Sequence, residues 1–148
     1  MKKVIKVIGI ALVVLVVTMV ISTPFVNNYS AAKIEKRLTA LPLPEKTEYI
    51  ESISKAGKMT GNGNGMQFLG AMLVQSELTL EELDAYYATY RENQWDCIVE
   101  VQESPSLEFV EHGELSFVTD ISPDEGCFVI YSWGNGIEPF QMLDIRGN

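Results

Sequence analysis

Apolar residues form one long uninterrupted run at the start of the chain. Residues 7–26 contain no charged side chain, and Lys2, Lys3 and Lys6 precede them. About 20 apolar residues, at a rise of about 1.5 Å each, match a hydrocarbon core roughly 30 Å thick. The pattern predicts a transmembrane anchor at 1–26, and the flanking lysines predict that the N-terminus stays in the cytoplasm. The remainder would then be extracytoplasmic.

A retained anchor and a cleaved signal peptide compete as interpretations of this run. The best small-residue cleavage site, Ser30-Ala31-Ala32, lies too far beyond Ile21 for a signal peptide, in which cleavage follows a short apolar core directly. A lipoprotein signal needs a cysteine just past the run, and the two cysteines are Cys97 and Cys127. We therefore expect a single-pass cell-membrane protein that contacts membrane lipid through its anchor.

Helical spacing continues beyond the anchor. Apolar residues recur at intervals of three and four at Ala31, Ile34, Leu38 and Leu41. Prolines 42 and 44 then disfavour helical geometry in the residues before them and remove backbone donors. The pattern predicts a juxtamembrane stalk helix with a proline linker at 27–43, followed by a folded domain at 44–148.

The first part of this domain predicts a β-hairpin. Strand-like stretches at 47–59 and 66–75 flank a glycine-rich loop made of Gly61, Asn62, Gly63, Asn64 and Gly65. Glycine and asparagine tolerate the positive φ that tight hairpin loops need. A phosphate-binding loop would instead lead into a helix. The loop nevertheless stays a candidate ligand loop, because its backbone groups can contact a ligand.

One helix and several strands are predicted after the hairpin. Thr79 and Glu82 have the spacing of a capping box, which predicts a helix from Leu80 to about Glu92. The later strand-like stretches are 95–102, 107–110, 115–118, 127–133 and a short edge strand at 140–145. Short connections favour antiparallel pairing. The expected fold class is α+β: an antiparallel sheet in the order strand-strand-helix-strand-strand-strand, with one helix packed on it.

Charge narrows the choice of partners. The formal net charge is −9, and two basic residues, Arg91 and Arg146, stand against sixteen acidic residues beyond Lys58. An acidic field repels phosphate backbones, so we expect no nucleic-acid partner. The simplest role of this charge is to keep an extracytoplasmic domain soluble.

Candidate chemistry is sparse. His112 is the one histidine, and the sequence contains no nucleophile-elbow motif such as G-x-S-x-G. We therefore nominate no catalytic residue, no metal ligand and no cofactor. Cys97 and Cys127 are a candidate disulfide, because an exported domain meets conditions in which disulfides persist. Two buried thiols are the alternative.

The run from Glu77 to Val101 places a short helix with aromatic residues before a tryptophan and an alternating strand. Together with LPLPE at 41–45 and GNGNGM at 61–66, it resembles uncharacterised small single-pass, membrane-anchored bacterial extracytoplasmic α+β proteins. The resemblance implies fold and location and carries over no catalytic residue. The expected function is a membrane-tethered binding or protein-interaction module, with another envelope or membrane protein as a candidate partner. The alternative is a small extracytoplasmic enzyme, or enzyme accessory, with a carboxylate-lined site.

Overall fold

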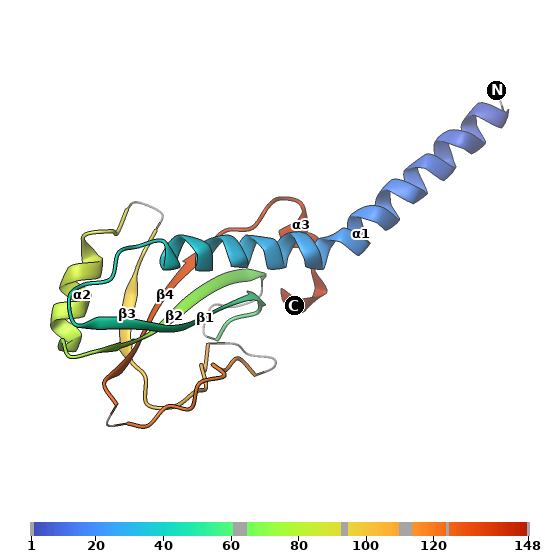
Figure 1. The fold of residues 1–148 in the computed structure, drawn as a ribbon. Helices are drawn as coiled ribbons and strands as arrows, with labels where there is room; N and C mark the ends of the chain where they lie inside the picture. Colours follow the sequence, from blue (N-terminus) through green and yellow to red (C-terminus); the bar gives the residue numbers. More distant parts are fainter. Residues whose placement is uncertain (1, 61–64, 93–94, 110–113, 124, 148) are drawn as a thin grey trace.

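The computed structural model of the chain describes residues 2–60, 65–92, 95–109, 114–123 and 125–147. The elements are α1 (Lys2–Thr39), β1 (Thr47–Gly57), β2 (Gln67–Ser76), α2 (Leu80–Ala88), β3 (Ile98–Val101), β4 (Cys127–Gly134), α3 (Phe140–Leu143) and the 3₁₀ helix η1 (Ile145–Gly147). The strands form one antiparallel sheet in the order β1-β2-β4-β3 (Figure 1). The α+β class is therefore confirmed.

The predicted hairpin is present. β1 pairs with β2 from Thr47↔Ser76 to Gly57↔Gln67, with one irregularity between Tyr49 and Glu51. β4 then pairs with the other edge of β2. Four of the five candidate loop residues, 61–64, lie outside the described residues.

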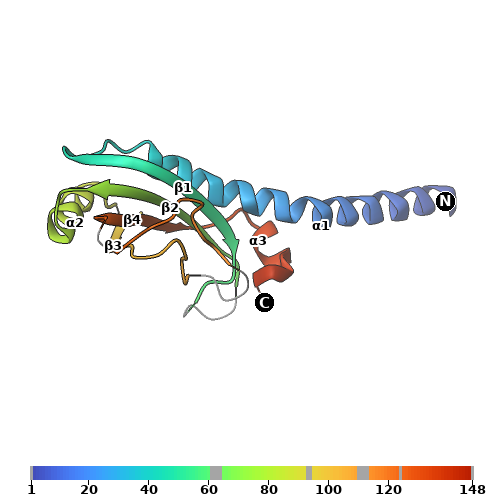
Figure 2. The same ribbon diagram turned by 60° about the horizontal axis from the view of Figure 1, so that its bottom comes forward.

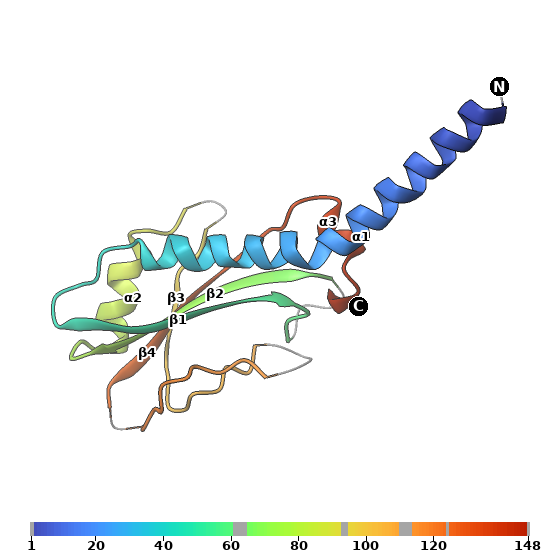
Figure 3. The same cartoon turned by 45° about the vertical axis from the view of Figure 1, so that its right-hand side comes forward.

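Helix α1 is the candidate membrane span, by length and composition, and its apolar half is exposed. It differs from the expected stalk, because its second half packs against β1, β2 and β4 as a layer of the folded domain. Ala31, Ile34 and Leu38 are buried there. Figures 2 and 3 show this half lying along the sheet while the N-terminal half projects away. The spacing of three and four that suggests a stalk is also the spacing of a core helix.

Pro24 lies inside α1, which runs without a break through the predicted boundary between anchor and stalk. A proline within a helix removes one backbone donor and is a common cause of bending. The helix changes direction close to the point where it meets the sheet (Figure 1). The apolar half and the packed half are thus parts of one continuous helix.

A glycine lets α1 approach the sheet closely. A Cβ atom added to Gly70 would lie 2.4 Å from the backbone nitrogen of Glu35. The Glu35 carboxylate accepts hydrogen bonds from Ser52 at 2.7 Å and from Ser54 at 2.6 Å. These bonds tie α1 to β1, while Gly70 brings the helix close to β2.

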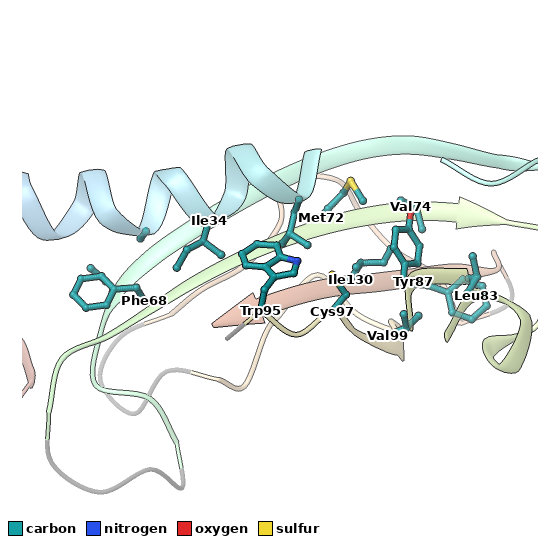
Figure 4. Packing of buried hydrophobic residues seen from close by; sticks show 14 of the residues in the cluster. Ile34, Phe68, Met72, Val74, Leu83, Tyr87, Trp95, Cys97, Val99 and Ile130 are labelled. Atoms are coloured by element: carbon teal, nitrogen blue, oxygen red, sulfur yellow. The ribbon is translucent and has the colours of Figure 1, made fainter. Parts of the chain in front are cut away.

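Both faces of the sheet carry apolar cores. The helix-face cluster joins α1 and α2 to the sheet, and Figure 4 shows Ile34 and Trp95 between α1 and the strands, with Tyr87 and Leu83 further along. The loop-face cluster packs the opposite face against the connection between β3 and β4. That connection contributes Leu107, Leu115, Phe117 and Ile121. The sheet is therefore a central layer.

Two strand predictions in this connection were wrong. Stretches 107–110 and 115–118 form no strand within the described residues, and an isolated bridge joins Ser106 to Ser116. Leu107, Leu115 and Phe117 are buried against the sheet face without joining its ladder. The predicted edge strand at 140–145 is wrong as well, because α3 and the start of η1 occupy those positions. Short apolar runs do not by themselves distinguish these conformations.

The predicted capping box is confirmed. The backbone N–H of Glu82 donates to the Thr79 hydroxyl, and the Glu82 carboxylate accepts from the backbone N–H of Thr79. Leu83 and Tyr87 are buried on one side of α2. The helix ends at Ala88, four residues before the predicted end.

A polar cluster fastens the C-terminal segment to α1; we call it the C-terminal clamp, comprising Asn27, Asp144 and Arg146. Asn27 Nδ2 donates to Asp144 Oδ2 at 2.8 Å. The Arg146 guanidinium donates to both Asp144 oxygens, at 2.9 and 2.7 Å, and to Asn28 Oδ1 at 2.9 Å. The clamp thereby joins the end of the chain to the middle of α1.

The clamp predicts an acid-sensitive contribution to stability. Hydrogen bonds from Arg146, opposed by burial and supported by Asn27, lower the pKa of Asp144 from 3.8 to about 2. Because the folded-state pKa is depressed, the stabilisation is present above about pH 4 and is lost as the pH falls toward 2. We expect Asp144→Asn to lower the free energy of unfolding by about 2 kcal/mol at pH 6, measured by chemical denaturation in detergent.

The matched control is Asp120→Asn, since Asp120 is exposed. This variant should keep wild-type stability at both pH 6 and pH 2.5. The difference between wild type and Asp144→Asn should shrink at pH 2.5. A difference that is constant with pH would contradict the ionised clamp.

Candidate functional site

A groove of about 760 Å³ opens between α1, the connection that leads into β3, and the C-terminal end of β4; we call it the α1 groove. Its wall on α1 consists of Ser30, Lys33, Ile34 and Arg37. Facing them are Glu92, Trp95, Trp133, Gly134, Asn135 and Ile137. Helical spacing brings Lys33 and Arg37, four residues apart, to the same side of α1.

Arg37 is the best-positioned polar group in the groove. Its guanidinium carbon lies 4.0 Å from the centre of the Trp95 ring, and its Nη2 lies 3.0 Å from Glu92 Oε2. An isolated antiparallel β-bridge, formed by backbone hydrogen bonds, holds Glu92 and Trp95 together. Both charged side chains are largely exposed, so the ion pair adds little stability. The guanidinium is therefore held in place yet accessible to a ligand.

The strand pairing of β4 is incomplete beside the groove. β3 pairs only with residues 128–131 of β4. Among the described residues, Ser132, Trp133 and Gly134 consequently have no strand partner on that side. Ser132 is buried, whereas Trp133 and Gly134 are partly exposed and line the groove, so this part of β4 is the part that a ligand can reach.

The charge of the groove contrasts with that of the domain. Among the described residues, its lining contains two cations, Lys33 and Arg37, and one carboxylate, Glu92, which is ion-paired. Trp95, Ile34 and Ile137 supply apolar surface next to these charges. Convergent polar groups on a partly apolar wall are typical of binding sites. This arrangement suits a ligand that combines an anionic group with an apolar one.

The candidate ligand loop is described only at Gly65. Gly65 has a φ of 142°, and its N–H donates to the Gly147 carbonyl at 2.7 Å. Its backbone donor is thus used within the chain. Gly61, Asn62, Gly63 and Asn64 lie outside the described residues, so a ligand at this loop stays a prediction.

The two cysteines lie on opposite faces of the sheet. Cys97 belongs to the helix-face cluster and Cys127 to the loop-face cluster. Both are buried free thiols, and burial raises the pKa of each. A disulfide requires Cα atoms within about 7 Å and Cβ atoms that point toward each other. Their placement favours two thiols over the candidate bridge.

We therefore expect two alkylations per chain when unreduced protein is denatured, measured by intact mass. The native protein should react slowly, because both thiolates are disfavoured by burial. Protein reduced before denaturation provides the reference mass. Absence of labelling without reduction, together with two labels after reduction, would restore the disulfide.

The residues of the α1 groove were not nominated from the sequence. Lys33 and Arg37 lie within the predicted stalk helix at 27–43, on which basic side chains would ordinarily be solvated. The one sequence feature that could have pointed to Lys33 and Arg37 is their four-residue spacing next to the apolar residue Ile34. Which strand end they face depends on how α1 crosses the sheet.

No family model matches the chain, and no curated protein or solved structure matches it either.

Proposed function

We propose that the chain is a membrane-tethered extracytoplasmic binding module that uses the α1 groove to engage another envelope component. The proposal is carried by one observation: the candidate span and the groove wall belong to the same continuous helix. The N-terminus would be cytoplasmic, and the folded domain would lie outside.

Because the helix is continuous, the groove lies at a defined distance from the end of the candidate span. Ser30 and Arg37 follow the last residue of the apolar run, Val26, by four and eleven positions. At about 1.5 Å per residue, they lie roughly 6 to 16 Å beyond the end of the span. A partner that reaches this groove would be engaged close to the membrane surface. We infer a membrane or envelope protein with an exposed segment that is acidic and apolar.

The alternative of a small enzyme with a carboxylate-lined site calls for two converging carboxylates. Glu92 is the carboxylate in the groove lining, and it is paired with Arg37. The groove geometry therefore favours binding over acid–base chemistry. Nucleic acid does not suit the acidic charge of the domain.

The test is site-specific photo-crosslinking in intact membranes. A photoreactive amino acid at Ile137, on the groove wall, should give a discrete adduct. The same amino acid at Val118, which is 93% exposed and lies outside the lining set, should not. Equal adducts from both positions would indicate non-specific contact and contradict the proposal.

A charge-reversal pair sharpens this test. Lys33→Glu should reduce the Ile137 adduct about tenfold, which corresponds to about 1.4 kcal/mol of lost binding. Lys36→Glu changes an exposed lysine on the same helix outside the groove lining and should leave the adduct unchanged. Equal losses from both variants would indicate a general effect of charge and count against the groove.

A further inference from the structure

The C-terminal segment, residues 140–147, lies beside α1 at the point where the apolar run ends. Asn27 Nδ2 donates to the Phe140 carbonyl at 3.1 Å, and Arg146 Nη1 donates to Asn28. Figures 1 and 2 show α3 and the C-terminus at the end of the domain from which the apolar half of α1 projects. If α1 spans a membrane, this segment lies at the membrane surface.

The burial pattern of this segment is the reverse of that in an ordinary surface helix, which buries apolar side chains and exposes charged ones. Its carboxylate, Asp144, is buried in the C-terminal clamp, whereas Met142 is 78% exposed and Ile145 is 84% exposed. α3 has no buried residue. Polar groups thus face the protein, and large apolar groups face away from it. Such a pattern is favourable where the surroundings are apolar.

Exposed aromatic residues also lie on α1 near the level at which the segment contacts the helix. Phe25, near the end of the apolar run, and Tyr29, three residues beyond it, are both exposed. Aromatic residues are enriched where a membrane meets water. The apolar residues of the span, including Val14, are exposed as well. The contacts of the segment with Asn27 and Asn28, at the end of the candidate span, identify the partner surface as lipid.

We propose that residues 140–147 form an interfacial element that inserts Met142 and Ile145 into the outer leaflet, with the C-terminal clamp holding it to α1. The inference rests on the proposed membrane insertion of α1. The element adds a second lipid contact and determines which side of the folded domain faces the membrane. The α1 groove would then have a fixed orientation toward the membrane.

The test measures lipid proximity at single positions of the full chain. Met142→Cys, Val14→Cys and Val118→Cys proteins are labelled natively with an environment-sensitive fluorophore. They are reconstituted in vesicles of phosphatidylcholine and phosphatidylglycerol, with or without nitroxide on the acyl chains. Wild-type protein treated in the same way is the labelling blank, because both native thiols are buried. Met142 is exposed, so its substitution leaves the core intact.

We expect blue-shifted emission and strong loss of fluorescence to the nitroxide lipid at positions 14 and 142, with little loss at 118. Loss at 14 without loss at 142 would overturn the interfacial element while leaving the membrane tether intact. No loss at 14 would overturn the tether and, with it, this inference. Concentration-dependent energy transfer between labels at 142, without quenching by lipid, would assign the surface to a second copy and overturn the lipid contact.

Discussion

Replacing Gly70 with alanine is expected to destabilise the protein by about 3 kcal/mol, a large effect for a single methyl group. The new Cβ would lie 2.4 Å from the Glu35 nitrogen and 2.8 Å from the Ile34 carbonyl carbon, both backbone atoms. Backbone cannot rotate away as a side chain can, so α1 must shift from the sheet and lose packing. Chemical denaturation in detergent, followed by tryptophan fluorescence, measures the change.

Gly134→Ala is the matched control for this substitution. Its Cβ would also meet α1, but the obstructing atom is the terminal carbon of the Ile34 side chain. A rotamer change can relieve that contact at a cost of about 1 kcal/mol. Equal, small losses in the two variants would contradict the close approach of helix and sheet at Gly70.

Leu38→Ala is expected to cost about 3 kcal/mol, since large-to-small changes at fully buried leucines typically cost 2 to 5 kcal/mol. Leu38 is completely buried beneath the last turns of α1. This result would separate a core helix from a free stalk, on which the same change removes little buried surface. The same denaturation assay applies.

Leu43→Ala provides the comparison, because Leu43 lies in the proline linker and is partly exposed. We expect it to cost less than about 1 kcal/mol. A Leu38→Ala cost as small as that of Leu43→Ala would restore the stalk interpretation of residues 27–39.

Strong local patterns predicted the corresponding elements correctly. The apolar run, the hairpin around the glycine-rich loop and the Thr79–Glu82 capping box each depend on interactions between residues close in sequence. Such signals survive folding because tertiary contacts reinforce them. The central strand β4 was also predicted from its apolar run.

The errors came from elements whose conformation depends on distant residues. Leu107, Leu115 and Phe117 are apolar because they cover the sheet, and coverage does not require a strand. The role of α1 depends on Gly70, which lies far away in sequence and lets the helix approach. The α1 groove escaped prediction for the same reason, since it forms between residues 30–37 and two later segments, around 92–95 and 133–137.

The most direct measurement for the central claim, a membrane-spanning α1 with an external domain, is protease accessibility in intact cells. Protease added outside should degrade the region beyond Pro44, as it degrades a known outward-facing control protein. A cytoplasmic control protein should stay intact, and digestion after detergent lysis establishes that the folded domain is cleavable. Degradation of the domain in intact cells is the result that the account predicts. A domain protected in intact cells, while the outward-facing control is cleaved, would contradict it.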